Sequence, residues 1–168
     1  MTVWVNDDGL RVYFPGDLVD VKGGEFPGAG EFREITLKVD VADLTTTAAV
    51  LDQFIVVPRN SRIHKVRVTA ETAAATVTSV TFGLKRLDGS TEIDHDGLVN
   101  QLVVASLNVA GETNEITAGG TSAGALIGTT TAYPGLLCGQ IAGSAGTGVL
   151  VLTVVLYVPG ADANPTNF

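Results

Sequence analysis

Alternation of apolar and polar residues is the dominant pattern from residue 31 onward, and it predicts β-strands. Within residues 33–44, four apolar residues, Ile35, Leu37, Val39 and Val41, alternate with polar ones. Successive side chains of a strand point to opposite faces of the sheet, so this spacing predicts a strand with one buried face.

The same pattern predicts three more strands before residue 90. They cover residues 53–57, 63–70 and 76–87. Pro58 begins a turn after the first, and Asp88-Gly89 is a turn signal after the last. The chain is therefore expected to form a series of short strands joined by turns.

The C-terminal third of the chain combines Gly- and Thr-rich segments with short apolar runs at 125–127, 136–138 and 149–158. Glycine-rich turns between short strands are typical of sandwiches and jelly rolls. Residues 97–107 fit a helix and a strand equally well, because their apolar positions satisfy both periods. We predict an all-β fold, an antiparallel β-sandwich that is jelly-roll-like.

The first thirty residues differ from the rest. Residues 3–5 and 10–14 flank the turn signal Asn-Asp-Asp-Gly at 6–9, which predicts a hairpin. Residues 22–30 hold four glycines and a proline, a composition typical of a loop or linker. The expected division is an N-terminal arm or hairpin with its linker (1–30), a β-sandwich core (31–161) and a C-terminal tail (162–168).

Charge is distributed unevenly along the chain, whose formal net charge is −8. All ten Lys and Arg residues lie between Arg11 and Arg86, whereas seven acidic residues and no basic ones follow residue 86. Nucleic acid and anionic membranes are poor partners for such a chain, because phosphate binding depends on clusters of Lys and Arg. The longest apolar run has ten residues (149–158), about half of what a membrane-spanning helix needs.

A long stretch without charge occupies residues 116–161. Its strand 149–158 is apolar on both faces, one of which carries Leu150, Leu152, Val154 and Leu156. Such a strand lies centrally in a two-layer fold or is covered by another chain, and both readings stay open for this strand. For the whole stretch, depletion of charge favours an interface. We expect self-association through these four residues in a homo-oligomer, a homotrimer; the alternative is a monomer that is stable only on its partner.

Candidate chemistry is sparse. Glu92–Gly97 resembles the start of a calcium loop, but Val103 occupies the position of the required bidentate Glu. His95 has flanking carboxylates and no recognisable nucleophile motif beside it. Cys138, in an apolar run, is interpreted as a small buried hydrophobe. We expect no enzyme activity, no catalytic residue, no bound metal and no cofactor.

Two groups of residues are candidates for contact with a partner. A basic cluster of Arg59, Arg62, Lys65 and Arg67 fits either a solvated strand face or a docking patch for an acidic surface, and Arg59 and Arg62 are its candidates for contact with a partner. Aromatic residues gather in the arm, where they are suited to anchoring in a pocket of a partner or to packing on the chain's own sandwich. They are Trp4, Tyr13, Phe14 and Phe26, followed by Phe32.

From Phe54 to Gly111 the chain has a recognisable order of elements. An apolar strand ends in a Pro turn, a second strand follows, and a Thr/Ala-rich segment leads to the strand VTFGLK and an acidic turn. This order resembles that of head decoration, or cement, proteins of tailed bacteriophages. Similar modules occur in phage fibre and tail-adaptor proteins, so the resemblance covers a module rather than the whole chain.

The resemblance implies a trimeric jelly-roll-like sandwich on the outer capsid surface of a virion. There it would tie neighbouring subunits of the major capsid protein together. The aromatic arm would grip the capsid, and residues 116–161 would serve self-assembly. The alternative is a carbohydrate- or receptor-binding module of a phage fibre or tail, because sandwiches on fibres bind glycans through aromatic platforms and acidic loops.

Overall fold

The computed structural model describes residues 3–5, 11–13 and 31–159. The chain divides into one unit of residues 31–158 and a second unit formed by 1–30 and 159–168. In the second unit, β1 (Val3–Val5) pairs antiparallel with β2 (Arg11–Tyr13), with Trp4 opposite Val12. The N-terminal hairpin predicted from the sequence is confirmed.

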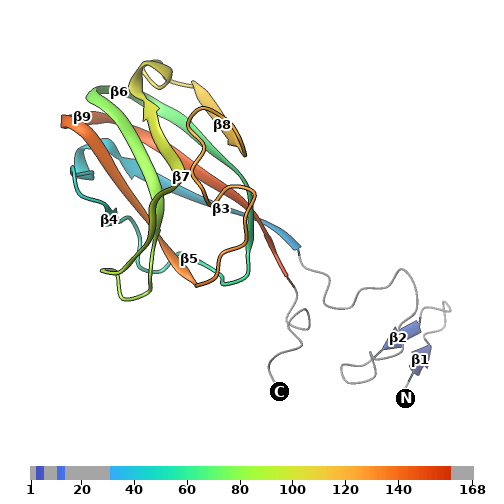
Figure 1. The fold of residues 1–168 in the computed structure, drawn as a ribbon. Helices are drawn as coiled ribbons and strands as arrows, with labels where there is room; N and C mark the ends of the chain where they lie inside the picture. Colours follow the sequence, from blue (N-terminus) through green and yellow to red (C-terminus); the bar gives the residue numbers. More distant parts are fainter. Residues whose placement is uncertain (1–2, 6–10, 14–30, 160–168) are drawn as a thin grey trace. The chain divides into compact units, whose positions relative to one another are not determined.

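The larger unit consists of seven antiparallel strands (Figure 1). Its helical segments among the described residues are 3-10 turns of three residues, none of them long enough to cross a membrane. The all-β prediction is confirmed, and residues 97–103 form strand. The strands are β3 (Glu31–Asp40), β4 (Ala49–Val50), β5 (Val56–Val57), β6 (Arg62–Lys85), β7 (Glu92–Val103), β8 (Thr113–Thr117) and β9 (Gly135–Val158), with 3-10 turns at Val41–Asp43 and Val104–Ser106.

Strands β6 and β9 are each 24 residues long, and they pair with each other on both sides of a bend. Figure 1 shows both strands running to one end of the unit, turning over and returning. The N-terminal half of β6 pairs with the C-terminal half of β9, and the remaining halves pair in the same way. The continuous sheet therefore makes two layers, β3-β9-β6-β8 and β4/β5-β9-β6-β7.

Local backbone irregularities explain the bend. The β6–β9 register shifts repeatedly between Ala70 and Ser79, and such bulges bend a strand and increase its twist. On β9, Gly143 and Gly148 have φ values of 97° and 118°, which a residue without Cβ adopts readily. The separate strands expected at 63–70 and 76–87 are thus two halves of β6. The runs at 136–138 and 149–158 are likewise parts of β9, whereas 125–127 lies in turns.

The two layers enclose one hydrophobic core. Val66 and Val68 from the first layer and Phe82 and Leu137 from the second are fully buried in the same cluster. Full burial of a side chain of this size contributes about 1.5–3 kcal/mol. The core accounts for the alternation seen in the sequence, including Ile35, Leu37 and Val39 on the inner face of β3.

Strand β9 lies between β3 and β6 in the first layer, and this position explains its two apolar faces. Leu150, Leu152, Val154 and Leu156 are 0% exposed and pack in the chain's own core. On the outer face, Thr153 and Val155 are also buried between the neighbouring strands. These side chains are therefore not a surface in the described unit, and self-association through other surfaces stays a prediction.

The sandwich has two different ends. The bend end contains the turns of β6 and β9 near residues 70–77 and 143–149. At the terminal end, Glu31 of β3 lies opposite Val158 of β9. The connections 58–61, 85–92 and 129–135 lie at this same end, where backbone hydrogen bonds and strand pairs join them.

Candidate functional site

Exposed hydrophobic side chains gather at the terminal end of the sandwich. Phe54 is 95% exposed, which leaves almost the whole ring in water. A cluster of large exposed apolar groups on a soluble domain marks a surface for interaction. Five of the seven such side chains among the described residues lie at or beside this end: Phe32, Phe54, Val56, Leu87 and Tyr133.

A turn before β5 places Phe54 on the surface. The backbone N–H of Phe54 donates to Oδ1 of Asp52 at 2.7 Å, and β5 itself pairs with Leu136 and Gly135 of β9. The strand expected over 53–57 is thus limited to its last two residues. Phe54 is apolar, but Asp52 and Pro58 on either side of it are both turn formers.

Arg86 and Tyr133 connect two segments of this end. The guanidinium carbon of Arg86 lies 3.9 Å from the centroid of the Tyr133 ring, a cation–π contact. Tyr133 is 48% exposed, and Leu87, next to Arg86 in the chain, is 53% exposed. An aromatic ring held in place on a surface loses little entropy when a partner covers it.

The turn between β6 and β7 is held by Asp88. Its carboxylate accepts hydrogen bonds from the Thr91 hydroxyl at 2.6 Å, the Thr91 N–H at 2.7 Å and the Ser90 N–H at 2.8 Å. These hydrogen bonds, led by that of the Thr91 side chain, hold the pKa of Asp88 well below its usual range. The turn predicted at Asp88-Gly89 is confirmed and keeps Leu87 in a defined place.

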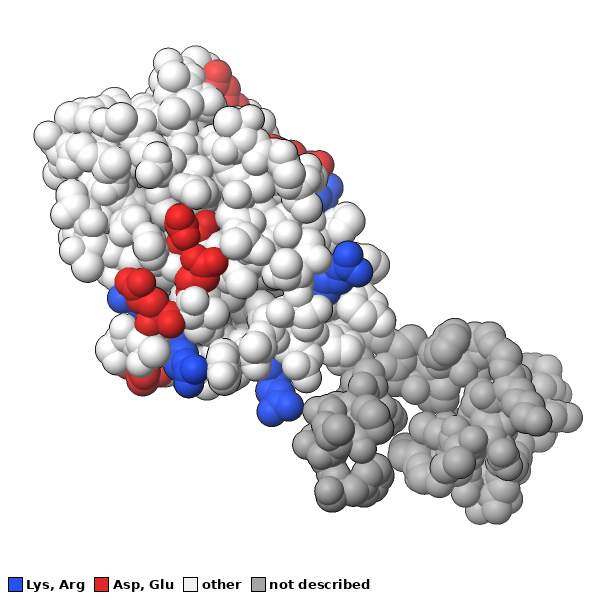
Figure 2. All heavy atoms as spheres, viewed as in Figure 1, with Lys and Arg blue, Asp and Glu red and all other residues white. Residues whose placement is uncertain are grey.

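The basic cluster at 59–67 is divided by the fold. Lys65 Nζ lies 2.8 Å and Arg67 Nη2 3.6 Å from Oε2 of Glu115 on β8, so the charges of these two residues are balanced locally. Arg59 and Arg62 are exposed beside the terminal end, and neither forms an ion pair with another described residue. Figure 2 shows Lys and Arg side chains near this end, some of them beside Asp and Glu side chains.

An aromatic group lies on the outer face of the first layer at the terminal end. The ring of Phe32 meets those of Tyr157 and His64 edge to face, at centroid distances of 5.6 and 5.9 Å. Phe32 remains 67% exposed. Among the expected arm residues, Trp4 belongs to β1 and Tyr13 to β2, while Phe14 and Phe26 lie outside the described residues.

The acidic segment at 92–97 forms the first half of β7, not a loop. Glu92 pairs with Lys85 and Asp94 with Leu84 of β6. Burial, together with a hydrogen bond and repulsion from Asp96, raises the pKa of Asp94. His95 Nδ1 lies 3.3 Å from Oε2 of Glu92. Within residues 3–5, 11–13 and 31–159, no three His, Cys, Asp or Glu side chains are grouped to hold a metal ion.

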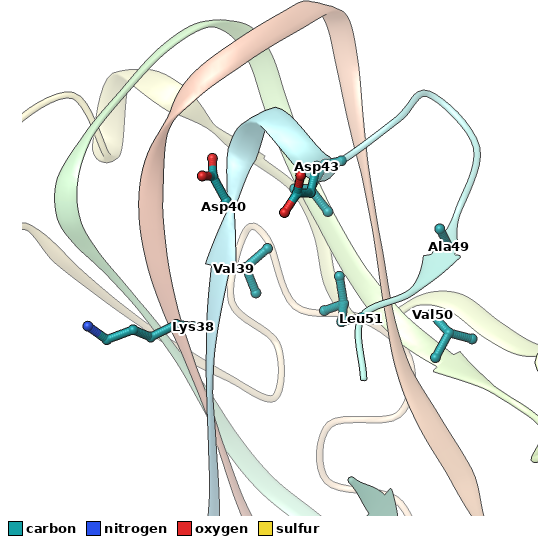
Figure 3. A pocket seen from close by; sticks show the side chains of 8 residues that line it. Lys38, Val39, Asp40, Asp43, Ala49, Val50 and Leu51 are labelled. Atoms are coloured by element: carbon teal, nitrogen blue, oxygen red, sulfur yellow. The ribbon is translucent and has the colours of Figure 1, made fainter. Parts of the chain in front are cut away.

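Cys138 is buried, and the hollows found in the described part of the chain are small. Cys138 is fully buried, and burial raises the pKa of its thiol to about 11, in keeping with a small buried hydrophobe. The hollow in Figure 3, between the end of β3 and β4, has a volume of about 110 Å³, and two others have volumes of about 210 and 270 Å³. Pockets for small organic ligands are usually about 300–1,000 Å³. The terminal end is therefore the candidate functional surface.

The chain was compared with protein families, curated proteins and solved structures. No family model matches the chain, and no curated protein matches it. A solved chain from the "acidic stable capsid structure of Helicobacter pylori bacteriophage KHP30" is 13% identical, with a TM-score of 0.47. The match covers 79% of this chain and 90% of that chain. A likeness at this level establishes no relationship, so the function is inferred from the chain's own residues.

Proposed function

We propose that this chain is a structural virion protein that binds the outer capsid surface of a tailed bacteriophage and bridges neighbouring subunits of the major capsid protein. The observation that carries the proposal is the exposed surface at the terminal end, where Phe54, Tyr133 and Leu87 accompany Arg59 and Arg62. Aromatic and arginine side chains are the residue types that contribute most to protein interfaces.

The type of partner comes from the sequence. The order of elements from Phe54 to Gly111 resembles that of head decoration proteins, whose partner is the major capsid protein. The exposed arginines would give this acidic chain a local positive charge that attracts acidic groups of the shell. The aromatic residues of the arm, Trp4, Tyr13, Phe14 and Phe26, form a second contact element in this proposal. Two contact elements on one chain favour bridging, because binding of the first raises the effective concentration of the second.

Under this proposal the chain has a structural role and is not an enzyme. Its thiol is buried, and His95 faces Glu92 at the start of β7. The first layer carries an outer face of threonines and balanced ion pairs, including Thr36 with Thr153 and Thr69 with Thr113. Such a polar face suits a layer that remains exposed to solvent while the terminal end contacts the capsid.

Co-sedimentation with shells that lack this protein tests the proposal. The full-length chain should pellet with the shells. A chain lacking residues 1–30 should not, although it retains every residue of the hydrophobic core, which lies within residues 39–156. The double substitution Arg59→Ala/Arg62→Ala should weaken binding and reduce its dependence on salt. A matched control is Ser144→Ala/Thr147→Ala, at two exposed positions of the bend end.

Two outcomes would contradict the proposal at different points. If the full-length chain does not pellet with shells, the proposed function is wrong. If it pellets and both changed chains pellet equally well, the chain binds shells through surfaces other than the arm and the two arginines.

A second candidate function rests on the aromatic group of Phe32, Tyr157 and His64. Exposed aromatic rings beside polar side chains are suited to stacking against sugar rings, and Phe32 is 67% exposed. This favours a carbohydrate-binding module of a fibre or tail. Binding on a glycan array that is lost in Phe32→Ala, without binding to shells, would select this function over the first.

A further inference from the structure

The outer edge of β3 is the one long strand edge that the described residues leave unpaired. β3 has ten residues and pairs only with β9 among the described strands. An unpaired edge presents a row of N–H and C=O groups that can pair with another strand. The edge is therefore a candidate for pairing between chains.

The other edges of the sandwich are short or covered. β4 and β5 have two residues each, and β8 has five. The edge of β7 is covered by the segment 122–126: Asn100 N–H donates to the Ser122 carbonyl, and Leu126 N–H donates to the Gly97 carbonyl. No backbone hydrogen bond of this kind reaches β3 from the described residues.

Side chains along β3 are arranged in two rows. Ile35 and Leu37 face the core but are only partly buried. Glu34, Thr36 and Lys38 face outward, opposite Val155, Thr153 and Val151 of β9. Figure 3 shows this alternation at the end of the strand, where Lys38 and Val39 point to opposite sides. The open edge thus leaves apolar groups partly in water.

Among registers that pair more than half of β3, self-pairing of this edge has one favourable register. In a sheet continued across two antiparallel copies of β3, opposed residues share a face, so odd-numbered residues meet odd-numbered ones. Registers centred on residue 34 or 38 set Glu34 against Glu34 or Lys38 against Lys38, and the one centred on residue 37 sets Glu34 against Asp40. The register centred on Thr36 sets each Glu34 opposite a Lys38 of the other copy, twice by symmetry. A centre at residue 39 also sets opposite charges together, Lys38 against Asp40, but it pairs only residues 38–40 of the strand.

The register centred on Thr36 also suits the inner row. It places Ile35 of one copy opposite Leu37 of the other, again twice, and so covers the apolar groups that are partly exposed. The alternative centre at residue 35 also avoids like charges, but it sets Lys38 against Phe32 and forms no pair of opposite charges. The register centred on Thr36 sets Phe32 against Asp40 but forms the two Glu34–Lys38 pairs. Opposite charges and apolar pairs across strands stabilise a sheet, whereas like charges directly opposed destabilise it.

Charge at this edge also gives selectivity. Glu34 has no ion-pair partner among the described residues, and Lys38 binds Glu71 at 2.7 Å through two largely exposed side chains. A bridge of this kind contributes little and can be exchanged. Charges on an edge discourage pairing with unrelated strands. The order Glu34–Thr36–Lys38 nevertheless permits pairing with a second, antiparallel copy, because each Glu34 then faces a Lys38.

We infer that two copies of this chain associate through β3, antiparallel and centred on Thr36, to form a continuous sheet across a twofold axis. A pairing of this kind is isologous, with the same patch on both copies. It differs from the homotrimer expected from the sequence, whose proposed surface lies in the core. The inference does not depend on whether the chain binds a capsid.

Sedimentation velocity of the full-length chain over about 1–100 µM tests this inference. The wild-type chain should form a dimer. Glu34→Lys and Lys38→Glu should each raise the dissociation constant at least about 10-fold, because each change creates two like-charge contacts. The exchange Glu34→Lys/Lys38→Glu should return it to within about 3-fold of wild type, because the pairs are restored with opposite polarity.

A control separates the edge from the intrachain bridge. Glu71→Gln removes the partner of Lys38 on β6 without changing β3, and dimerisation should persist. Circular dichroism establishes that each variant is folded. A monomeric or trimeric wild-type chain would overturn the inference, as would single variants that dimerise normally or a double exchange that fails to restore the dimer.

Discussion

The guanidinium carbon of Arg86 lies 3.9 Å from the ring centroid of Tyr133, and this contact joins the β6–β7 turn to the segment that leads into β9. Both residues belong to the terminal end, where Leu87 and Phe54 are also exposed. The contact gives this surface a fixed shape. An interface built on pre-positioned side chains binds with a smaller entropic penalty than one that must first become ordered.

A double-mutant cycle measures this contact. Arg86→Ala and Tyr133→Ala should each lower the free energy of unfolding by about 0.5–1 kcal/mol, because exposed cation–π pairs contribute roughly this amount. The double variant should lose less than the sum of the two, since both single changes remove the same contact. Urea unfolding followed by circular dichroism provides the values. Strict additivity would mean that the two side chains do not interact in solution.

Phe54→Ala should separate binding from stability. The ring is 95% exposed, so its removal should change the free energy of unfolding by less than about 0.5 kcal/mol. If the ring anchors in a partner, binding to shells should weaken about 10-fold or more. Val109→Ala is the matched control, because Val109 is 56% exposed and lies near the bend end. Equal binding by both variants would remove Phe54 from the docking surface.

Asp88 should make the chain less stable in acid. Hydrogen bonds from Thr91 and Ser90 hold its pKa below the value in the unfolded chain. Such a carboxylate contributes stability that is complete above the unfolded pKa, about 4, and is lost as the pH falls toward the folded pKa. The unfolding midpoint of Asp88→Asn should therefore lie below that of wild type at pH 7 and approach it near pH 2. A difference that stays constant with pH would contradict this role.

Gly83→Ala should destabilise the second layer strongly. A Cβ at this position would collide with the carbonyl oxygen of Asp94 and with the carbonyl group of His95. Backbone cannot yield as a flexible side chain does, so the loss should be about 3 kcal/mol or more in the free energy of unfolding. Gly120→Ala, in an exposed turn with its nearest contact at 3.1 Å, is the milder control. A similar loss in both variants would point to a general effect of added bulk.

Local sequence was sufficient for much of the fold. The alternation of Ile35, Leu37 and Val39 predicted β3 and its buried face, and Asp88-Gly89 predicted the turn that follows β6. Both depend on neighbouring residues, whose side chains alternate on a strand or bond within a turn. The all-β class follows from the same local signals.

Features that depend on distant parts of the chain were not predictable in the same way. The Thr/Ala-rich residues 72–78 have the composition of a loop, yet pairing with β9 keeps them within one bent strand. The apolar residue Leu152 fitted an interface as well as a core, and only its place between β3 and β6 decides for the core. The exposure of Phe54 was not predictable either, because hydrophobicity alone does not distinguish an interior ring from one on a docking surface.

Imaging of shells by electron cryomicroscopy, with and without the added full-length chain, tests the central proposal most directly. The proposed function predicts additional density on the outer shell surface that contacts neighbouring major capsid subunits, with the end of the sandwich that carries Phe54 and Arg59 turned toward them. A shell whose surface is unchanged by saturating protein, or density confined to fibres or the tail, would contradict the proposal.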